Sequence, residues 1–426
     1  MTGRRRLAAA VLAATLVVAA CGQDEPEVAA TRGQALESTT TSALVVTTPP
    51  TTARSTTTPS SEPIPTAPSS TTEAPTTTAA TVAQTTAATT GSGGAPVTTT
   101  PSGGGGDTAI YRGILGALGP NEIVTPAVAP APTVAAGILP LTGLPSATGD
   151  VPNRPAAVVK IDNSSAARPQ SGLNAADIVI EEEVEGGITR LAAVFHSTGA
   201  IVGPVRSGRT TDIGIINAFG SPLLLYSGAN EVTDTLLRAQ AEVQNRSAAR
   251  SSGYWRRSGR RAPSNLYSDT GPHWASAAGG APPAQFAYRA DGVAPGGIPD
   301  ASLTVNYRAS RADWAWDGTA WLRTQRGTPH MTDAGTQVSA ANVVVIEADE
   351  VPSGMVDSGG ANVPEFVFVG TGKATVYTAG NRIEGVWTRP TLRSAATLTT
   401  AGGAVIELTP GRTWIELIGA GSGIHG

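Results

Sequence analysis

The sequence is poor in the residue types that many functional sites need. Cys21 is the only cysteine among 426 residues, so an intrachain disulfide is excluded. The chain also has only four histidines, which is few for a zinc centre: His196, His273, His330 and His425. We therefore expect no disulfide scaffold and assign no metal-ligating residue, and the sequence does not identify a cofactor.

Charged and aromatic residues are also scarce, at 15% and 4% of the chain. A globular domain carries about 25% charged residues, and glycine and proline make up about 12% of it. Here 50 glycines and 32 prolines account for 82 of the 426 residues, which excludes one uniformly packed domain. The net charge of −4 gives the chain no overall basic character, and we expect no nucleic-acid partner.

The amino-terminal segment predicts export and membrane anchoring. Three arginines at positions 4–6 precede an uncharged run, 7–20, that is shorter than the ~20 residues of a membrane span. Small residues directly before Cys21 resemble the lipobox of bacterial lipoproteins, which implies cleavage before Cys21 and its acylation. The alternative is ordinary secretion with a chance cysteine near the cleavage site. We predict a signal peptide over 1–20 and an extracytoplasmic protein anchored to the cell membrane through Cys21.

A low-complexity segment follows the anchor. Between positions 38 and 106, 59 of 69 residues are Ser, Thr, Pro, Ala or Gly. Such a composition buries too little apolar surface to offset the entropy of ordering. We predict a disordered tether over 21–138 that lets the folded part reach into or past the cell wall.

The remaining residues predict an α+β protein. An apolar strand at 156–161 and a helical stretch at 213–219 favour a mixed α/β domain over 139–295. Trp314 and Trp316 alternate before Asp317-Gly318, a pattern typical of a hairpin. Further short strands follow, so we predict a mainly antiparallel β domain over 296–426.

Two strand-like runs, 178–185 and 188–196, are joined by Gly186-Gly187. A two-residue glycine turn would pair Glu183 with Arg190 across the hairpin. Alternation then predicts one polar face, made of Glu181, Glu183, Glu185, Arg190 and His196. This face is either a solvated sheet surface or the wall of a site for a metal or a cationic or polyhydroxy ligand. Glu181 and Glu185 are our candidate catalytic carboxylates.

A Gly- and Pro-containing loop after this hairpin carries Arg206 and Arg209 just before the predicted helix. Two arginines at a helix start suit a carboxylate or phosphate, which makes them, with Arg190, candidate ligand-binding residues. Alternatively, Arg206 and Arg209 form structural ion pairs with the glutamates of the hairpin.

An ordered set of motifs resembles the YerB-like bacterial lipoproteins, a family of unknown function. The motifs are P-L-T-G at 140–143, I-D-N at 161–163, A-R-P-Q-S-G-L at 167–173, E-G-G-I-T-R at 185–190, G-P-V-R-S at 203–207, G-T-P-H-M-T-D at 327–333, G-T-G-K at 370–373 and G-R-T-W-I at 411–415. The resemblance covers nearly all of 139–426 and agrees with a lipid-anchored envelope protein, but it implies no reaction. Within these motifs Asn163, Arg168 and Gln170 are further candidate ligand-binding residues.

His330 is the candidate catalytic residue of the carboxy-terminal half. A nearby Asp333 would orient it as a base, whereas a lone histidine otherwise serves as a structural hydrogen-bonding group. In the family pattern we expect an aliphatic residue directly before this aspartate. Here Met331-Thr332 precede Asp333, so the resemblance does not assign a role to Asp333.

Six arginines without an acidic residue lie between 246 and 261, together with Tyr254 and Trp255. In an exported protein this segment favours an anionic envelope polymer or lipid headgroup as partner, or it is a basic loop with no dedicated partner.

Two hypotheses of function follow. The first is a non-catalytic, lipid-tethered module that binds envelope polymer or a membrane partner protein. The second is a carboxylate-dependent hydrolase or transferase that acts on cell-wall glycan. The chain lacks G-x-S-x-G, H-E-x-x-H and phosphate-loop motifs, so no recognised catalytic motif decides between them.

Overall fold

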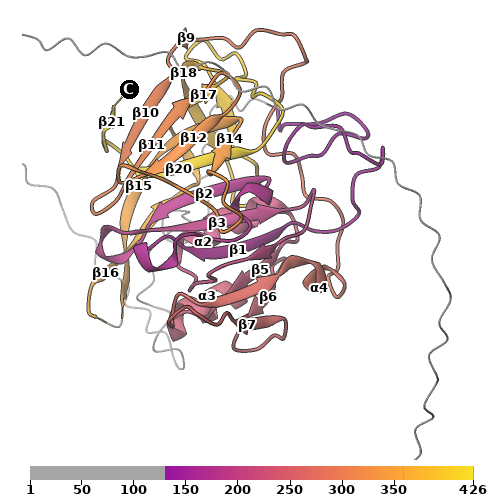
Figure 1. Ribbon diagram of the computed structural model, residues 1–426. Coiled ribbons are helices and arrows are strands. Elements are labelled where there is room, and N and C mark those ends of the chain that lie inside the picture. Colours follow the sequence, from indigo (N-terminus) through magenta and orange to yellow (C-terminus); the bar gives the residue numbers. More distant parts are fainter. Residues whose placement is uncertain (1–129, 358, 426) are drawn as a thin grey trace, which may run out of the picture. The chain divides into compact units, whose positions relative to one another are not determined.

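A computed structural model describes residues 130–357 and 359–425 (Figure 1). The predicted signal peptide, Cys21 and the tether up to residue 129 lie outside the described residues. No helix in the described part is long and apolar enough to cross a membrane.

One twelve-stranded sheet runs through most of the described chain. Its strands are β1 (Ala157–Asp162), β2 (Ile178–Glu183), β3 (Thr189–Phe195), β5 (Leu223–Tyr226), β6 (Gln244–Ser247), β9 (Ile298–Pro299), β15 (Asn342–Val356), β16 (Asn362–Val367), β17 (Gly370–Thr378), β18 (Asn381–Arg389), β19 (Thr397–Thr399) and β20 (Thr413–Gly419). The main order is β19-β18-β17-β15-β20-β2-β3-β1-β5-β6. Strand β20 pairs in parallel with both β2 and β15. Strands from either side of the predicted domain boundary at 295/296 thus share one sheet.

Two smaller sheets, three short α-helices and four single-turn 3-10 helices complete the described part of the fold. The six-stranded sheet contains β10 (Ser302–Asn306), β11 (Arg311–Trp316), β12 (Trp321–Gln325), β13 (Thr328–Pro329), β14 (Ser339–Ala340) and β21 (Ile424–His425). The three-stranded sheet contains β4 (Ile201–Val202), β7 (Tyr254–Arg256) and β8 (Leu266–Asp269). The α-helices are α2 (Thr211–Ile216), α3 (Glu231–Arg238) and α4 (Thr270–Trp274).

The mixed α/β domain predicted over 139–295 is not clearly present, because strands predominate there too. Its helices are short for a local reason. Five of the six residues of α2, T-D-I-G-I-I, are β-branched or glycine, which are poor helix formers. Helix α4 contains Gly271 and Pro272. The predicted antiparallel character of 296–426 holds for the six-stranded sheet, while β15 and β20 pair in parallel.

The central strands of the large sheet are buried on both faces. One face packs against α2 and α3, for example through Val158, Ile180 and Leu237. The other packs against the six-stranded sheet, where Trp314 and Trp321 fill the interface. All six residues of β1, A-V-V-K-I-D, are therefore buried, and a polar residue in the central strands must find its partner inside the protein.

The register predicted for the β2–β3 hairpin is wrong by one residue. The connection is a three-residue turn, Glu185–Gly187, in which Gly186 and Gly187 adopt φ values of 72° and 70°. Consequently Glu182, not Glu183, lies opposite Arg190. A slip of one residue exchanges the two faces of a strand. Arg190 is thus on the face opposite to Glu181 and Glu183, and the predicted polar face does not form.

Candidate functional site

A buried hydrogen-bond network joins the large sheet to the six-stranded sheet. Its centre is Arg323 of β12, which is fully buried. The Nη2 atom of Arg323 lies 2.6 Å from Oε2 of Glu181, whose side chain is also fully buried. The Nη1 atom lies 2.6 Å from Nδ1 of His330 and 2.5 Å from Oε1 of Gln325. Arg323 therefore connects two of the three candidate catalytic residues.

Two candidate ligand-binding residues extend the same network. The amide of Asn163 donates to Oε1 of Glu181 at 3.0 Å. The amide of Gln170 donates to Oδ1 of Asn163 at 3.1 Å, and its Oε1 atom lies 2.8 Å from Nε2 of His330. The structure thus brings Glu181, Asn163, Gln170 and His330 together, and all four are buried.

The network leaves His330 neutral and enclosed. Burial, followed by the charges of Arg323 and Arg168, lowers its pKa well below the ordinary value. Because Nδ1 faces a guanidinium donor it must accept, so Nε2 carries the proton and donates to Gln170. Asp333 does not orient this ring. It binds Arg257 at 2.8 Å and the hydroxyl of Ser171.

A second carboxylate faces the same guanidinium. Glu416 of β20 lies opposite Glu181 across the β2–β20 pair. It accepts from the Tyr307 hydroxyl at 2.6 Å and from Nε1 of Trp314 at 2.7 Å. Burial and the charge of Glu181 raise the pKa of Glu416 to about 7. The charge of Arg323 opposes this shift, so one buried arginine acts on two buried carboxylates.

A separate buried cluster lies on the helix side of the sheet. Nζ of Lys160 lies 2.5 Å from Oε1 of Glu182 and 2.7 Å from Oδ1 of Asp212, and all three side chains are fully buried. Burial lowers the pKa of Lys160, but the two carboxylates outweigh burial, so the pKa of Lys160 is raised. Burial and the negative charge of Asp212 raise the pKa of Glu182 to about 7, although Lys160 opposes this shift. A lysine inside an apolar strand was the available sequence signal for this cluster.

The third candidate catalytic residue, Glu185, lies in a cluster of arginines. Its carboxylate binds Nη2 of Arg190 at 2.9 Å and Nε of Arg209 at 2.7 Å. Burial opposes ionisation of Glu185, but the two arginines lower its pKa to about 2. Arg206 pairs instead with Asp162, at 3.2 Å. Both arginines of the predicted anion clamp thus have carboxylate partners within the protein.

The half-buried Arg168 donates to the backbone oxygen of Asn163 at 2.9 Å. His196, predicted on the polar face, is fully buried, and its Nε2 atom lies 3.0 Å from the backbone oxygen of Pro152. Among the described residues, no three His, Cys, Asp or Glu side chains are grouped to hold a metal ion.

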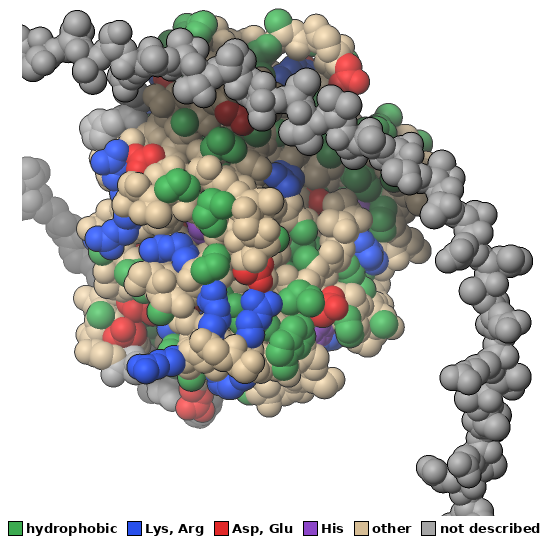
Figure 2. Space-filling model, in the orientation of Figure 1, with side chains coloured by type: hydrophobic (Ala, Val, Ile, Leu, Met, Phe, Trp, Pro, Cys, Tyr) green, Lys and Arg blue, Asp and Glu red, His purple; other side chains and the backbone are tan. Residues whose placement is uncertain are grey.

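An open pocket of about 520 Å³ lies beside these clusters. Its lining contains two arginines, two aromatic residues and a serine, and no acidic residue: Arg206, Ser227, Ala248, Ala249, Tyr254, Trp255, Arg256, Pro263 and Leu266. In Figure 2 basic side chains gather over the part of the molecule where β6 and β7 lie in Figure 1. The basic segment predicted at 246–261 contributes five of these nine residues, among them Tyr254, Trp255 and Arg256. Ser227, which has no distinctive sequence context, was missed.

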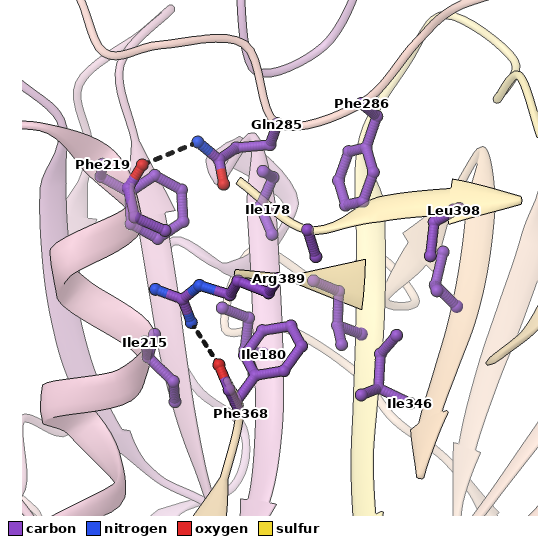
Figure 3. A pocket seen from close by; sticks show the side chains of 14 residues that line it. Ile178, Ile180, Ile215, Phe219, Gln285, Phe286, Ile346, Phe368, Arg389 and Leu398 are labelled. Carbon is purple, nitrogen blue, oxygen red and sulfur yellow. Dashed lines mark hydrogen bonds between the residues drawn. The ribbon is translucent and has the colours of Figure 1, made fainter. Parts of the chain in front are cut away.

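A second cavity, shown in Figure 3, lies inside the core and is lined by apolar side chains together with Gln285 and Arg389. It has room for about 20 Å³, no more than one water molecule. The guanidinium of Arg389 points into it and donates to the backbone oxygen of Phe368 at 2.8 Å. This cavity is a packing gap rather than a ligand site.

The chain matches a protein family that has no assigned reaction. The family described as "Protein of unknown function (DUF3048)" matches with its N-terminal domain at residues 141–281 and its C-terminal domain at 302–415. The Bacillus subtilis (strain 168) protein named "Putative lipoprotein YerB" is 28% identical over 305 residues, which are 66% of this chain and 85% of that protein. The crystal structure of YerB from Bacillus subtilis matches with a TM-score of 0.57 and 24% identity, over 68% of this chain and 99% of that one. The likeness predicted from the sequence motifs is confirmed.

Proposed function

We propose that this chain, which belongs to the DUF3048 family of proteins of unknown function, is a lipid-anchored envelope protein. Its folded part binds an anionic envelope polymer. The lipobox-like sequence before Cys21 and the lipoprotein name of the Bacillus relative support the anchor. The predicted tether places the folded part at a distance from the membrane.

One observation carries the binding function. The carboxylates that would perform hydrolysis are buried and paired with arginine, whereas the open pocket is lined by arginines and aromatic residues without an acid. A glycan hydrolase needs carboxylates that reach the scissile bond. Glu181 is fully buried, so a polymer cannot contact it without rearrangement of two packed sheets. The arginines that line the open pocket favour binding of an anion.

Sedimentation with purified cell walls tests this function. The full chain, purified in detergent, is mixed with intact walls and with walls stripped of their anionic polymer. We expect it to sediment with intact walls, to remain mostly soluble with stripped walls, and to bind more weakly as salt rises. Equal sedimentation with both wall preparations contradicts the proposal.

The same samples test the hydrolase alternative. Release of soluble glycan by the wild-type chain, and its loss in E185Q and E181Q variants, would favour an enzyme instead. The E185Q variant is the more informative of the two. The side chain of Glu185 is 11% exposed and can be reached from solvent, whereas that of Glu181 is fully buried.

A further inference from the structure

We infer that the pocket lined by Arg206, Ser227, Trp255 and Arg256 binds a sugar unit that carries a negatively charged group, either phosphate or carboxylate. This inference rests on the proposed function and names the binding site and the ligand class. Neither arginine alone identifies a site. The position in the fold, the charge and the shape of the lining lead to the same ligand.

The pocket lies where the carboxyl ends of three parallel strands meet. Strands β1, β5 and β6 are parallel neighbours. Asp162 ends β1, Ser227 follows β5 and Ala248 follows β6. In open sheets with parallel strands, ligands bind in the crevice outside the carboxyl ends. Two of these three residues line the pocket, and Asp162 holds the Arg206 side chain that lines it.

Backbone hydrogen bonds fix Arg206 at this edge. Its N–H donates to the Lys160 oxygen at 2.8 Å, and its carbonyl oxygen accepts from the Ser227 N–H at 2.9 Å. Asp162, 3.2 Å from Nε of Arg206, is itself held by the hydroxyl of Ser264 at 2.8 Å. The guanidinium is therefore preorganised, and with 26% of the side chain exposed it keeps donors available to the pocket.

Arg256 supplies positive charge that has no described carboxylate partner. It is exposed, and its Nη1 atom lies 2.5 Å from Oδ1 of Asn265, a neutral group. No acidic residue lines the pocket, so a bound anion meets two guanidinium groups there, of which Arg206 is paired with the buried Asp162. Arginine binds carboxylate and phosphate with paired hydrogen bonds, which suits either charged group.

The aromatic residues and the size favour a ring-containing ligand over a bare ion. Trp255 is 40% exposed, which leaves a large apolar ring available for contact. Tyr254 is held by its hydroxyl, which donates to the Arg246 backbone oxygen. The pocket volume of about 520 Å³ lies within the range of small-molecule sites, about 300–1,000 Å³, and far exceeds that of a phosphate ion. A sugar ring fits the aromatic surface while its charged group pairs with the arginines.

Calorimetric titration of the full chain tests the ligand class with four probes. Glucose 6-phosphate and glucuronic acid carry both ring and charge, glucose lacks the charge, and inorganic phosphate lacks the ring. We expect the charged sugars to bind about tenfold more tightly than glucose or phosphate, the size of one lost charge-assisted hydrogen bond. The tighter of the two charged sugars identifies the charged group. Equal binding of glucose and the charged sugars, or no binding of either charged sugar, overturns the inference.

Variants R256Q and W255A test the location. Both residues are exposed, so neither change is expected to disturb folding, and each should weaken binding of the charged sugar and of intact walls about tenfold. R261Q is the matched control, because Arg261 is exposed and lies outside the pocket lining. If the wild type sediments with walls and both pocket variants do so equally well, the pocket is not the site but the proposed function stands. If the wild type does not bind walls, the proposed function itself fails.

Discussion

Arg323 and Glu181 form an ion pair of 2.6 Å in which neither side chain is exposed to solvent. The two residues are 142 positions apart and come from different sheets, so the pair fixes one sheet on the other. Charged groups in such a site are costly to bury, and only complete hydrogen bonding compensates for the lost hydration.

Removal of one member of this pair should therefore destabilise the protein strongly. We expect R323M to lower the free energy of unfolding by about 3–5 kcal/mol, because Glu181 is left buried without its counter-ion. Urea denaturation followed by tryptophan fluorescence measures the change. The control is R393Q, which breaks the exposed Arg393–Glu242 pair of 3.2 Å and should cost no more than about 1 kcal/mol. Similar losses in both variants would contradict the role assigned to burial.

Glu416 should make stability fall as pH rises from acid to neutral. Burial and Glu181 raise its pKa from 4.5 to about 7 in the folded protein, whereas the unfolded chain releases the proton near 4.5. Its contribution is thus fully present below pH 4.5 and is lost as the pH rises to about 7. The E416Q variant lacks this titration.

Urea midpoints of wild type and E416Q between pH 4.5 and 7.5 measure the effect. The difference in unfolding free energy between the two should shift by about 1–3 kcal/mol in favour of E416Q over this range. E407Q serves as control, because Glu407 is exposed. A constant difference between wild type and E416Q would show that Glu416 titrates normally.

Much of the fold follows from local sequence, but the register of its central hairpin does not. The apolar runs predicted β1, β2 and β3, and the glycine pair at 186–187 predicted the turn between β2 and β3. Because both glycines take left-handed φ values, Glu185 joins them in a three-residue turn rather than ending the strand. Pattern alone does not distinguish turns of two and three residues here, and that difference decides the face on which Arg190 lies.

The candidate site was only partly predictable, since its partners are distant in sequence. Glu181 was chosen from the hairpin pattern and His330, Asn163 and Gln170 from motifs, yet the residue that connects them, Arg323, stands in no motif. Glu416 reaches Glu181 only because β20 inserts beside β2. Local periodicity also predicted one polar face for β2, either solvated or forming the wall of a site. Because β1 and β2 are covered on both faces, all of their glutamates and lysines are buried. The buried pair of Glu182 and Lys160 was therefore overlooked.

Glu185 should make stability fall as the pH is lowered, the opposite pH dependence to that of Glu416. Although burial opposes its ionisation, Arg209 and Arg190 lower its pKa to about 2, below the 4.5 of the unfolded chain. Its stabilising contribution is therefore present above pH 4.5 and is lost as the pH falls to about 2. We expect E185Q to be less stable than wild type at pH 6 and to approach wild type at pH 2.5, as measured by thermal unfolding. A deficit that persists unchanged at pH 2.5 would point to lost packing rather than lost charge.

Arg389 is a buried arginine whose hydrogen bonds go to backbone oxygens rather than to a carboxylate. It is fully buried, and its donors bind backbone oxygens: Nε donates to the Ser394 oxygen and Nη1 to the Phe368 oxygen, both at 2.8 Å. Further donors bind the oxygens of Gly214 in α2 and of Leu392. Burial lowers the pKa of this guanidinium. The side chain thus ties a helix, a strand and a loop together by neutral acceptors.

Replacement of Arg389 by methionine should leave these carbonyl oxygens without donors and cost about 2–4 kcal/mol in the urea assay. The informative variant is R389K, which keeps the positive charge but replaces the planar fork of donors by one ammonium group. Because a single nitrogen cannot span acceptors on three elements, we expect R389K to be nearly as unstable as R389M. Stability of R389K close to that of wild type would mean that the charge, and not the geometry of the donors, holds these elements together.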